Sequence, residues 1–206
     1  MACRQTGFAM LAEGNVQEVM DLSPVAHLAA IEGKTPFLNF FDGFRTSHEI
    51  QKVAMWDYKD LAEMCDMDAV QAFRDHALNP EHPHTRSHEN GDIFFQNREA
   101  CNKVYDELPA VVEGYMKKIN EKLGTDYGLF NYYGAPDADR VVVCMGSFCD
   151  VLEEVIDYLN AHGEKVGLVK VRLFRPFSIK HFVDVLPETV KKIAVMDRTK
   201  EPGSIG

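Results

Sequence analysis

The order of apolar and polar residues predicts alternating strands and helices at the start of the chain. Residues 7–11 (GFAML) form a short apolar run that is typical of a strand. Apolar residues then recur every three or four positions from 16 to 31, which indicates a helix with a wide apolar face. The run 37–41 (FLNFF) is almost entirely apolar and predicts a strand covered on both faces, as in a parallel sheet flanked by helices.

Residues with special backbone preferences mark the limits of this strand–helix–strand unit. Asn15 precedes the helical pattern and is followed by Glu18 three positions later, which is typical of a helix start. Pro24 lies inside the pattern and predicts a kink, or a restart after Ser23. Gly33 predicts a left-handed helix end.

A polar turn follows the second strand and carries the first candidate site. Thr46 and Glu49 have the spacing of a capping box. Because open α/β sheets bind ligands beyond the carboxyl ends of their strands, Asp42, Arg45 and His48 are candidates for lining a cleft or an intersubunit contact. The alternative is structural: Asp42 and Thr46 cap the turn, and Arg45 pairs with a neighbouring carboxylate.

The middle of the chain is predicted to be mainly helical. Asp66 is a candidate cap for a helix over 67–78. A short strand is predicted at 92–96, followed by a helix over 108–123 with Pro109 in its first turn. Residues 80–90 contain two prolines and no apolar periodicity, which predicts a surface or interface loop.

A second alternation begins near residue 139. Strands are predicted at 141–145, 166–174 and 193–196, with helices over 150–162 and 179–186 between them. The Gly146-Ser147 turn could approach a phosphate, but it lacks the further glycines of a dinucleotide-binding loop, so a tight turn is the favoured interpretation.

The predicted fold class is therefore α/β, with two partial open parallel sheets flanked by helices. We expect a first unit over 1–105, a helix and aromatic connector over 106–135, and an incomplete second unit over 136–206.

Composition narrows the class of partner. The 206 residues include 22 Lys and Arg and 32 Asp and Glu, so the formal net charge of −10 disfavours nucleic acid and anionic membranes as partners. The chain has no apolar run long enough for a membrane helix, and its start does not resemble a signal peptide. A cytoplasmic location is expected.

Metal-ligating residues are present without the spacing that metal sites use. The five cysteines, Cys3, Cys65, Cys101, Cys144 and Cys149, contain no C-x-x-C pair, so reduced thiols are favoured over an iron–sulfur cluster.

Four histidines, His76, His82, His84 and His88, lie in or beside the proline-broken loop, which is poorly suited to holding zinc. We expect no metal site in this chain.

Several longer strings resemble pyruvate:ferredoxin (flavodoxin) oxidoreductases, the anaerobic thiamine-diphosphate enzymes of pyruvate cleavage. The resemblance extends over essentially the whole chain, although a glycine usual in the family is missing between Arg86 and Ser87. The strings are RQTGFAMLAEGNVQEVMDL, FFDGFRTSHEIQK, ALNPEHP, DIFFQNREACN, YYGAPDADR, EKVGLVKVRLFRPFS and DRTKEPGSIG.

The resemblance implies an internal fragment of a much longer enzyme. Residues 1–105 would be the later part of the pyrimidine-side domain, and 136–206 an incomplete domain similar to the C-terminal domain of transketolases. The parent would be a homodimer that converts pyruvate and coenzyme A to acetyl-CoA and carbon dioxide and passes electrons to ferredoxin or flavodoxin. Its cofactors would be thiamine diphosphate, magnesium and iron–sulfur clusters.

The family's cofactor motif cannot be placed on this sequence. It needs Gly-Asp-Gly followed by an asparagine pair, whereas Gly91-Asp92 continues with Ile93 and the chain has no asparagine pair. We therefore expect no cofactor and no activity in these 206 residues alone. Two alternatives stay open: a stand-alone interaction module or split subunit that docks onto cofactor-bearing domains, and a small nucleotide-binding α/β protein.

Overall fold

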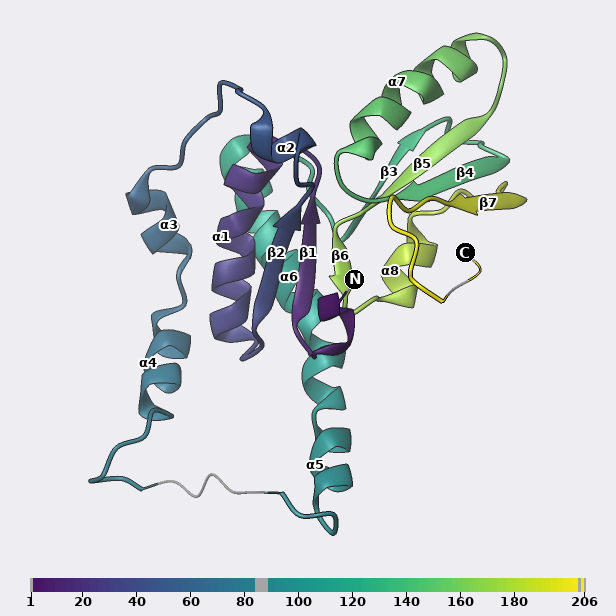
Figure 1. Ribbon diagram of the computed structural model, residues 1–206. Helices are drawn as coiled ribbons and strands as arrows, with labels where there is room; N and C mark the ends of the chain where they lie inside the picture. The colour runs from purple at the N-terminus through teal and green to yellow at the C-terminus, as the bar shows by residue number, and fades with distance from the viewer. Residues whose placement is uncertain (1, 84–88, 204, 206) are drawn as a thin grey trace.

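The computed structural model describes residues 2–83, 89–203 and 205, and it contains two β-sheets flanked by helices (Figure 1). The first sheet has the order β2 (Phe37–Phe41), β1 (Ala9–Glu13), β6 (Leu173–Arg175). The second has the order β3 (Phe130–Gly134), β5 (Val166–Val171), β4 (Arg140–Cys144), β7 (Lys192–Val195). The predicted α/β class with two partial sheets is confirmed.

Both sheets are mixed, which the sequence pattern did not predict. Strands β1 and β2 are parallel, with Ala9 opposite Phe37, whereas β6 joins β1 in antiparallel orientation with a register shift. In the second sheet β4 runs parallel to β5 and β7, and β3 is antiparallel to β5. The predicted single strand over 166–174 is wrong, because the chain changes sheets at Arg172, the one residue between β5 and β6.

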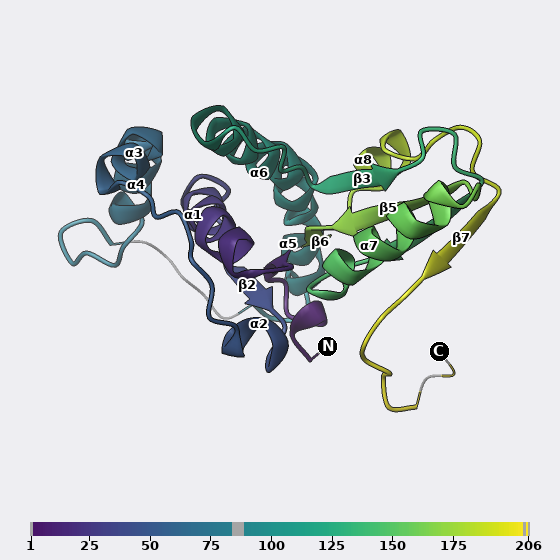
Figure 2. The same ribbon diagram turned by 90° about the horizontal axis from the view of Figure 1, so that it is seen from above.

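The helices cover the sheets unequally. They are η1 (Ala2–Gln5), α1 (Val16–Glu32), α2 (Arg45–His48), α3 (Tyr58–Met64), α4 (Met67–Asp75), α5 (Phe94–Ala100), α6 (Asn102–Leu123), α7 (Phe148–Ala161) and α8 (Ile179–Asp184). Helices α1 and α6 lie side by side next to the first sheet, whereas α7 and α8 lie on opposite sides of the second (Figures 1 and 2).

One hydrophobic core spans both sheets, and a smaller one lies beneath α7. The large core joins Leu11 of β1, Leu22 of α1 and Met116 of α6 to Val143 and Val169 of the second sheet. The small core packs buried residues of α7 against the opposite face of that sheet. Strand β2 is an edge strand whose residues are half-buried or exposed, so the expectation that it is covered on both faces is wrong within the described residues.

Helix α1 begins as predicted and ends differently. The Asn15 side chain accepts a hydrogen bond from the Glu18 N–H at 2.9 Å, which confirms the cap. Gly33 has φ −78°, and Lys34 takes the positive φ of 49° instead, so the predicted left-handed Gly33 is wrong.

The helix also runs without a break through Pro24. Proline has no N–H for the carbonyl four residues earlier, and that carbonyl, Met20 O, accepts a hydrogen bond from the Trp56 indole at 3.2 Å. A residue distant in sequence therefore satisfies the carbonyl that Pro24 leaves free.

Two predictions for the middle of the chain are wrong. Residues 94–100 form helix α5 and not a strand, and the long helix begins at Asn102, so Pro109 lies inside it. Pro109 is buried against the core, where side-chain packing offsets the missing backbone hydrogen bond. The helix ends at Gly124 in the left-handed conformation, with φ 70°.

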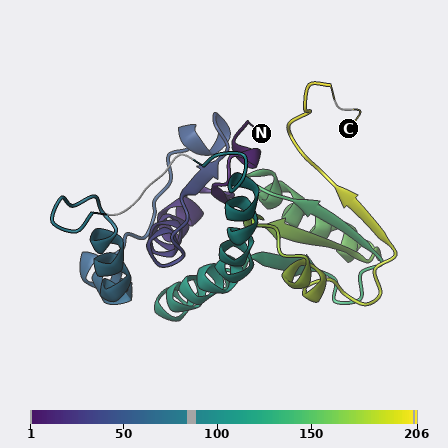
Figure 3. The same cartoon turned by 90° about the horizontal axis from the view of Figure 1, so that it is seen from below.

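Helices α3 and α4 form an arm beside α1, at a distance from the sheets (Figures 1 and 3). Asp66 caps α4 as predicted, but Phe73 and Leu78, at 69% and 78% exposure, do not face a core. Residues 84–88 of the loop over 80–90, which include His84, Arg86, Ser87 and His88, lie outside the described residues. No helix in the described part of the chain is long and apolar enough to cross a membrane.

Candidate functional site

The carboxyl ends of two pairs of parallel strands, β1 with β2 and β4 with β7, meet around one cavity. The cavity has a volume of about 290 Å³. Its lining includes Glu13 from β1, Asp42 after β2, Gly146 after β4, and Asp197 with Arg198 after β7. Open α/β folds place ligands at this position relative to their strands, so the junction of the two sheets is the candidate site.

Asp42 links the two sheets directly. Its Oδ2 accepts a hydrogen bond from the Ser147 N–H at 2.5 Å, and its Oδ1 lies 3.1 Å from Nη1 of Arg198. Ser147 is the N-cap residue of α7, where backbone N–H groups and the helix dipole favour a negative charge. The carboxylate therefore occupies the position that a bound anion would take.

Gly146 allows this approach. It has φ +78°, and a Cβ there would lie 2.8 Å from Asp42 Oδ2. Its carbonyl oxygen would also be 3.3 Å from a Cβ on Gly14, so the corner after β1 and the corner after β4 are in close contact. The structure thus brings together Asp42 and the Gly146-Ser147 turn, two features that the sequence pattern indicated separately.

Arg45 and His48 make local contacts. Arg45 Nε lies 3.2 Å from Glu49 Oε1, one helical turn away, and the Arg45 side chain is 64% exposed. The His48 ring stacks on the ring of Phe44 with centroids 5.0 Å apart. The pairing of Arg45 with a neighbouring carboxylate is the structural alternative that the sequence left open.

The start of α2 differs from the predicted capping box. Ser47, and not Glu49, accepts the hydrogen bond of the N-cap residue, because the Phe44 N–H donates to Ser47 Oγ at 2.8 Å. Thr46 is buried and donates to the carbonyl of Gly14 at 3.3 Å. Phe44 has φ 72° and is 83% exposed, a strained and solvent-facing position beside the candidate site.

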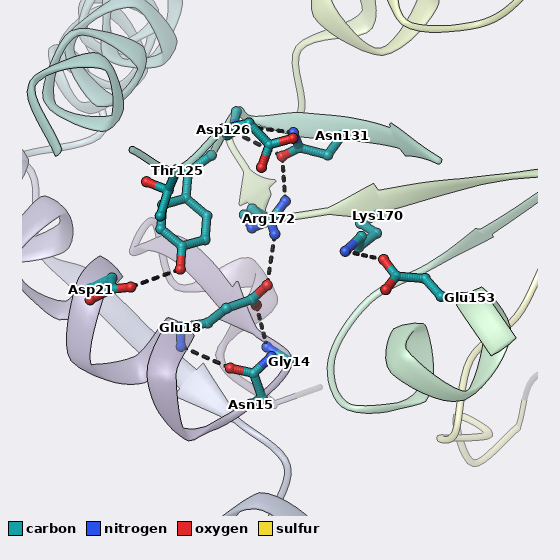
Figure 4. Close-up of polar contacts among 12 residues, drawn as sticks. Gly14, Asn15, Glu18, Asp21, Thr125, Asp126, Asn131, Glu153, Lys170 and Arg172 are labelled. Carbon is teal, nitrogen blue, oxygen red and sulfur yellow. Dashed lines mark hydrogen bonds and ion pairs between the residues drawn. The ribbon is translucent and has the colours of Figure 1, made fainter. Parts of the chain in front are cut away.

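A buried ion pair, which sequence analysis missed, joins α1 to the point where the chain changes sheets (Figure 4). Arg172 Nη2 lies 2.7 Å from Glu18 Oε1, and the two side chains are 6% and 12% exposed. The other Glu18 oxygen accepts the Gly14 N–H at 2.7 Å. Arg172 also donates to Asn131 Oδ1 of β3, and its guanidinium lies over the Tyr127 ring, 5.1 Å from the centroid.

A tyrosine–carboxylate bond reinforces this connection. The Tyr127 hydroxyl, in the segment that precedes β3, donates to Asp21 Oδ2 of α1 at 2.8 Å. Burial, followed by the hydrogen bond to Asp21, raises the pKa of Tyr127, so the hydroxyl keeps its proton at neutral pH. The only sequence signal for this network is that Arg172 interrupts the apolar run VGLVKVRLF.

The thiols of Cys144 and Cys149 are close neighbours in the small core at the same junction. Both are buried, one at the end of β4 and the other in the first turn of α7. Their mutual hydrogen bond lowers the pKa of Cys144, and together with burial it raises the pKa of Cys149. The remaining cysteines, Cys3, Cys65 and Cys101, are exposed or half-buried.

The junction does not fit a diphosphate or its metal. The α7 N-terminus already holds the Asp42 carboxylate, which would repel a phosphate. Among residues 2–83, 89–203 and 205, no group of three His, Cys, Asp or Glu side chains is arranged to hold a metal ion. The absence of a cofactor and a metal from this chain stays a prediction.

The fold and the junction define an α/β protein in which two partial sheets are held together by buried polar contacts. Its similarity to known proteins is specific. The family model described as pyruvate flavodoxin/ferredoxin oxidoreductase, thiamine diphosphate-binding, matches residues 1–117, and the model for pyruvate:ferredoxin oxidoreductase core domain II matches residues 138–206. The chain belongs to the pyruvate flavodoxin/ferredoxin oxidoreductase family.

Individual relatives match over the whole chain. A pyruvate-flavodoxin oxidoreductase of Enterobacter agglomerans is 60% identical over 205 residues, which are 99% of this chain and 18% of the relative. A pyruvate:ferredoxin oxidoreductase of Moorella thermoacetica is 59% identical over 207 residues, again with 18% of the relative covered. The chain therefore spans less than one fifth of the length of these relatives.

A solved structure shares the fold. The 2-oxoglutarate:ferredoxin oxidoreductase of Magnetococcus marinus aligns with a TM-score of 0.52 at 18% sequence identity. The alignment covers 91% of this chain and 34% of that chain.

Proposed function

We propose that the chain is part of a pyruvate:ferredoxin or pyruvate:flavodoxin oxidoreductase. The parent enzyme would cleave pyruvate oxidatively with coenzyme A, release carbon dioxide and acetyl-CoA, and pass two electrons to ferredoxin or flavodoxin. The observation that carries the proposal is the order of the two family models on one chain, together with about 60% identity to such enzymes.

Within that enzyme we assign the chain a structural role between two domains. Residues 1–105 would complete the pyrimidine-side domain, 106–135 would connect the domains, and 136–206 would begin the transketolase C-terminal-like domain. The Glu18–Arg172 pair and the Asp42–Ser147 bond support this role. The first joins α1 to the residue between β5 and β6, and the second joins the turn after β2 to the start of α7.

The chemistry would lie in other parts of the enzyme. Thiamine diphosphate with magnesium, the iron–sulfur clusters and the coenzyme A site would be held by domains that this chain does not supply. Asp42 would then be an interdomain contact and not a catalytic residue. The exposed Phe44 and His48 would contribute to the interface of a cytoplasmic homodimer.

A chimera tests the proposal. The corresponding residues of an active pyruvate-flavodoxin oxidoreductase are replaced by this chain, and reduction of a viologen dye is measured with pyruvate and coenzyme A. We expect activity with pyruvate and none with the 206 residues alone. A folded chimera that reduces the dye with 2-oxoglutarate and not with pyruvate contradicts the assigned substrate, and dye reduction by the 206 residues alone contradicts the assigned role.

A separately encoded subunit is a second candidate function, and exposed apolar residues favour it. Val195 in the edge strand β7 is 77% exposed, and Ile193 beside it is 47% exposed. Such an edge can pair with a further strand from a partner. Co-purification of the untagged chain with separately expressed cofactor-bearing domains would support this candidate, and a failure to co-purify would exclude it.

A further inference from the structure

A carboxyl group without a donor lies at the end of β1. Glu13 is 0% exposed, and neither of its carboxylate oxygens has a hydrogen-bond partner within the described residues. Oδ1 of Asn39, on the neighbouring strand β2, also lacks a hydrogen-bond donor. The amide nitrogen of Asn39 donates to Ser23 Oγ at 2.8 Å. Three buried oxygen acceptors therefore lack donors in one region of the first sheet.

The strand register places these acceptors on one face of the sheet. Asn39 lies opposite Leu11, and Glu13 follows Leu11 by two positions. Because side chains alternate along a strand, Asn39, Leu11 and Glu13 point to the same side of the sheet. An unsatisfied buried acceptor is costly, and a buried unpaired charge costs more. One proton on Glu13 removes the buried charge and lets the neutral acid donate its O–H to Asn39 Oδ1, which leaves only the Glu13 carbonyl oxygen without a donor.

The charged groups around Glu13 do not supply a counterion. From α1, Glu18 adds a negative charge. Three cations of the junction are engaged with other carboxylates: Arg172 with Glu18, Arg4 of η1 with Glu201, and Arg198 with Asp42. Arg175 of β6, the strand that pairs with β1, has its guanidinium over the Phe174 ring, 4.8 Å from the centroid. The remaining charged group that lines the cavity is Asp197, a further carboxylate.

We propose that Glu13 is a neutral carboxylic acid in the folded protein and shares its proton with Asn39 Oδ1, forming a buried proton site. The electrostatics agree with the geometry: burial raises the pKa of Glu13 to about 9, the neighbouring Asn39 side chain offsets a small part of the rise, and the Glu18 carboxylate adds to it. The proposal does not depend on the proposed function.

This proton site is coupled to the junction of the two sheets. Glu13 precedes Gly14, whose N–H is held by Glu18 and whose carbonyl accepts from Thr46. Ionisation of Glu13 would add a buried negative charge beside these contacts. Because the folded pKa is raised above the ordinary value of 4.5, the stabilisation is complete below that value and is lost as pH rises toward 9.

Urea unfolding of the 206-residue chain and of Glu13→Gln between pH 5.5 and 8 tests the proposal. Glutamine keeps the shape and donates an N–H without taking up a proton. We expect the unfolding constant of the unmodified chain, divided by that of Glu13→Gln, to rise about tenfold per pH unit. The matched control Glu121→Gln, at an exposed position of α6, should leave the pH dependence unchanged.

A ratio that stays constant with pH overturns the proposal. A second measurement needs no variant: a carboxyl ¹³C titration of the native protein should show the Glu13 signal in its protonated position at pH 7. A Glu13 signal that is fully ionised at pH 6 also overturns it.

Discussion

Arg172 stands at the point where the chain passes from one sheet to the other, and its removal should destabilise the protein severely. Its guanidinium pairs with Glu18 at 2.7 Å, and both side chains are nearly inaccessible to solvent. Arg172→Met keeps much of the apolar volume and removes the charge, so the Glu18 carboxylate stays buried without its cation.

The size of the effect follows from burial. An ion pair on the surface contributes about 0–1 kcal/mol, but breaking a buried pair by removing one partner costs about 3–5 kcal/mol. We expect Arg172→Met and Glu18→Gln each to lower the free energy of unfolding by about 3–5 kcal/mol. The double variant has no buried charge at this place, so its loss should be far smaller than the sum of the two single losses.

Urea unfolding at pH 7 and 25 °C, followed by far-UV circular dichroism, measures these free energies. Lys117→Met is the matched control, because it breaks an exposed pair with Glu113 at 3.1 Å and should cost less than about 0.5 kcal/mol. A loss below about 1 kcal/mol in Arg172→Met, or additive losses in the double variant, would refute the reasoning.

Other contacts at the junction and in the arm lead to three further predictions. Asp42→Ala should lower the free energy of unfolding by about 1–2 kcal/mol in the same urea assay, because the negative charge at the α7 N-terminus is lost. Arg198→Ala should lower it by less than about 1 kcal/mol, because the Arg198 side chain is 55% exposed. Gly146→Ala should cost about 1–3 kcal/mol, because φ is +78° and the new Cβ would meet Asp42; an unchanged unfolding midpoint would contradict this. Trp56→Phe should speed amide hydrogen exchange in α3 and α4, because the donor to the Met20 carbonyl is lost. Pro24→Ala is the control for Trp56→Phe. The N–H of the new alanine can bond to the Met20 carbonyl within α1, so this variant should leave amide exchange in α3 and α4 slow.

Local patterns predicted most of the elements, and the errors fall where tertiary contacts decide the structure. The Asn15 cap and the Asp66 cap were readable because one side chain satisfies backbone groups within a few residues. The apolar residues of 92–96 predict a strand, yet Phe94 begins helix α5, which ends at Ala100 just before the helix that contains Pro109. A short apolar run has no period that separates the two structures, so only its neighbours in space decide.

In the candidate site, too, the sequence indicated single residues but not the contacts between them. The sequence singled out Asp42 and the Gly146-Ser147 turn, because each follows an apolar strand. It did not indicate that they bind each other across 105 positions of chain. It also gave no hint that Glu13 would be buried without a donor, since burial depends on which helices cover the strand.

By itself the sequence determined the alternation of strands and helices, the acidic balance and the family, because these depend on residue types and short spacings. Only the tertiary structure decided that Arg172 divides one apolar run between two sheets, with Glu18 as its buried partner. The physical reason is that such contacts join residues more than a hundred positions apart, and the cost of breaking them depends on their burial, which no local pattern records.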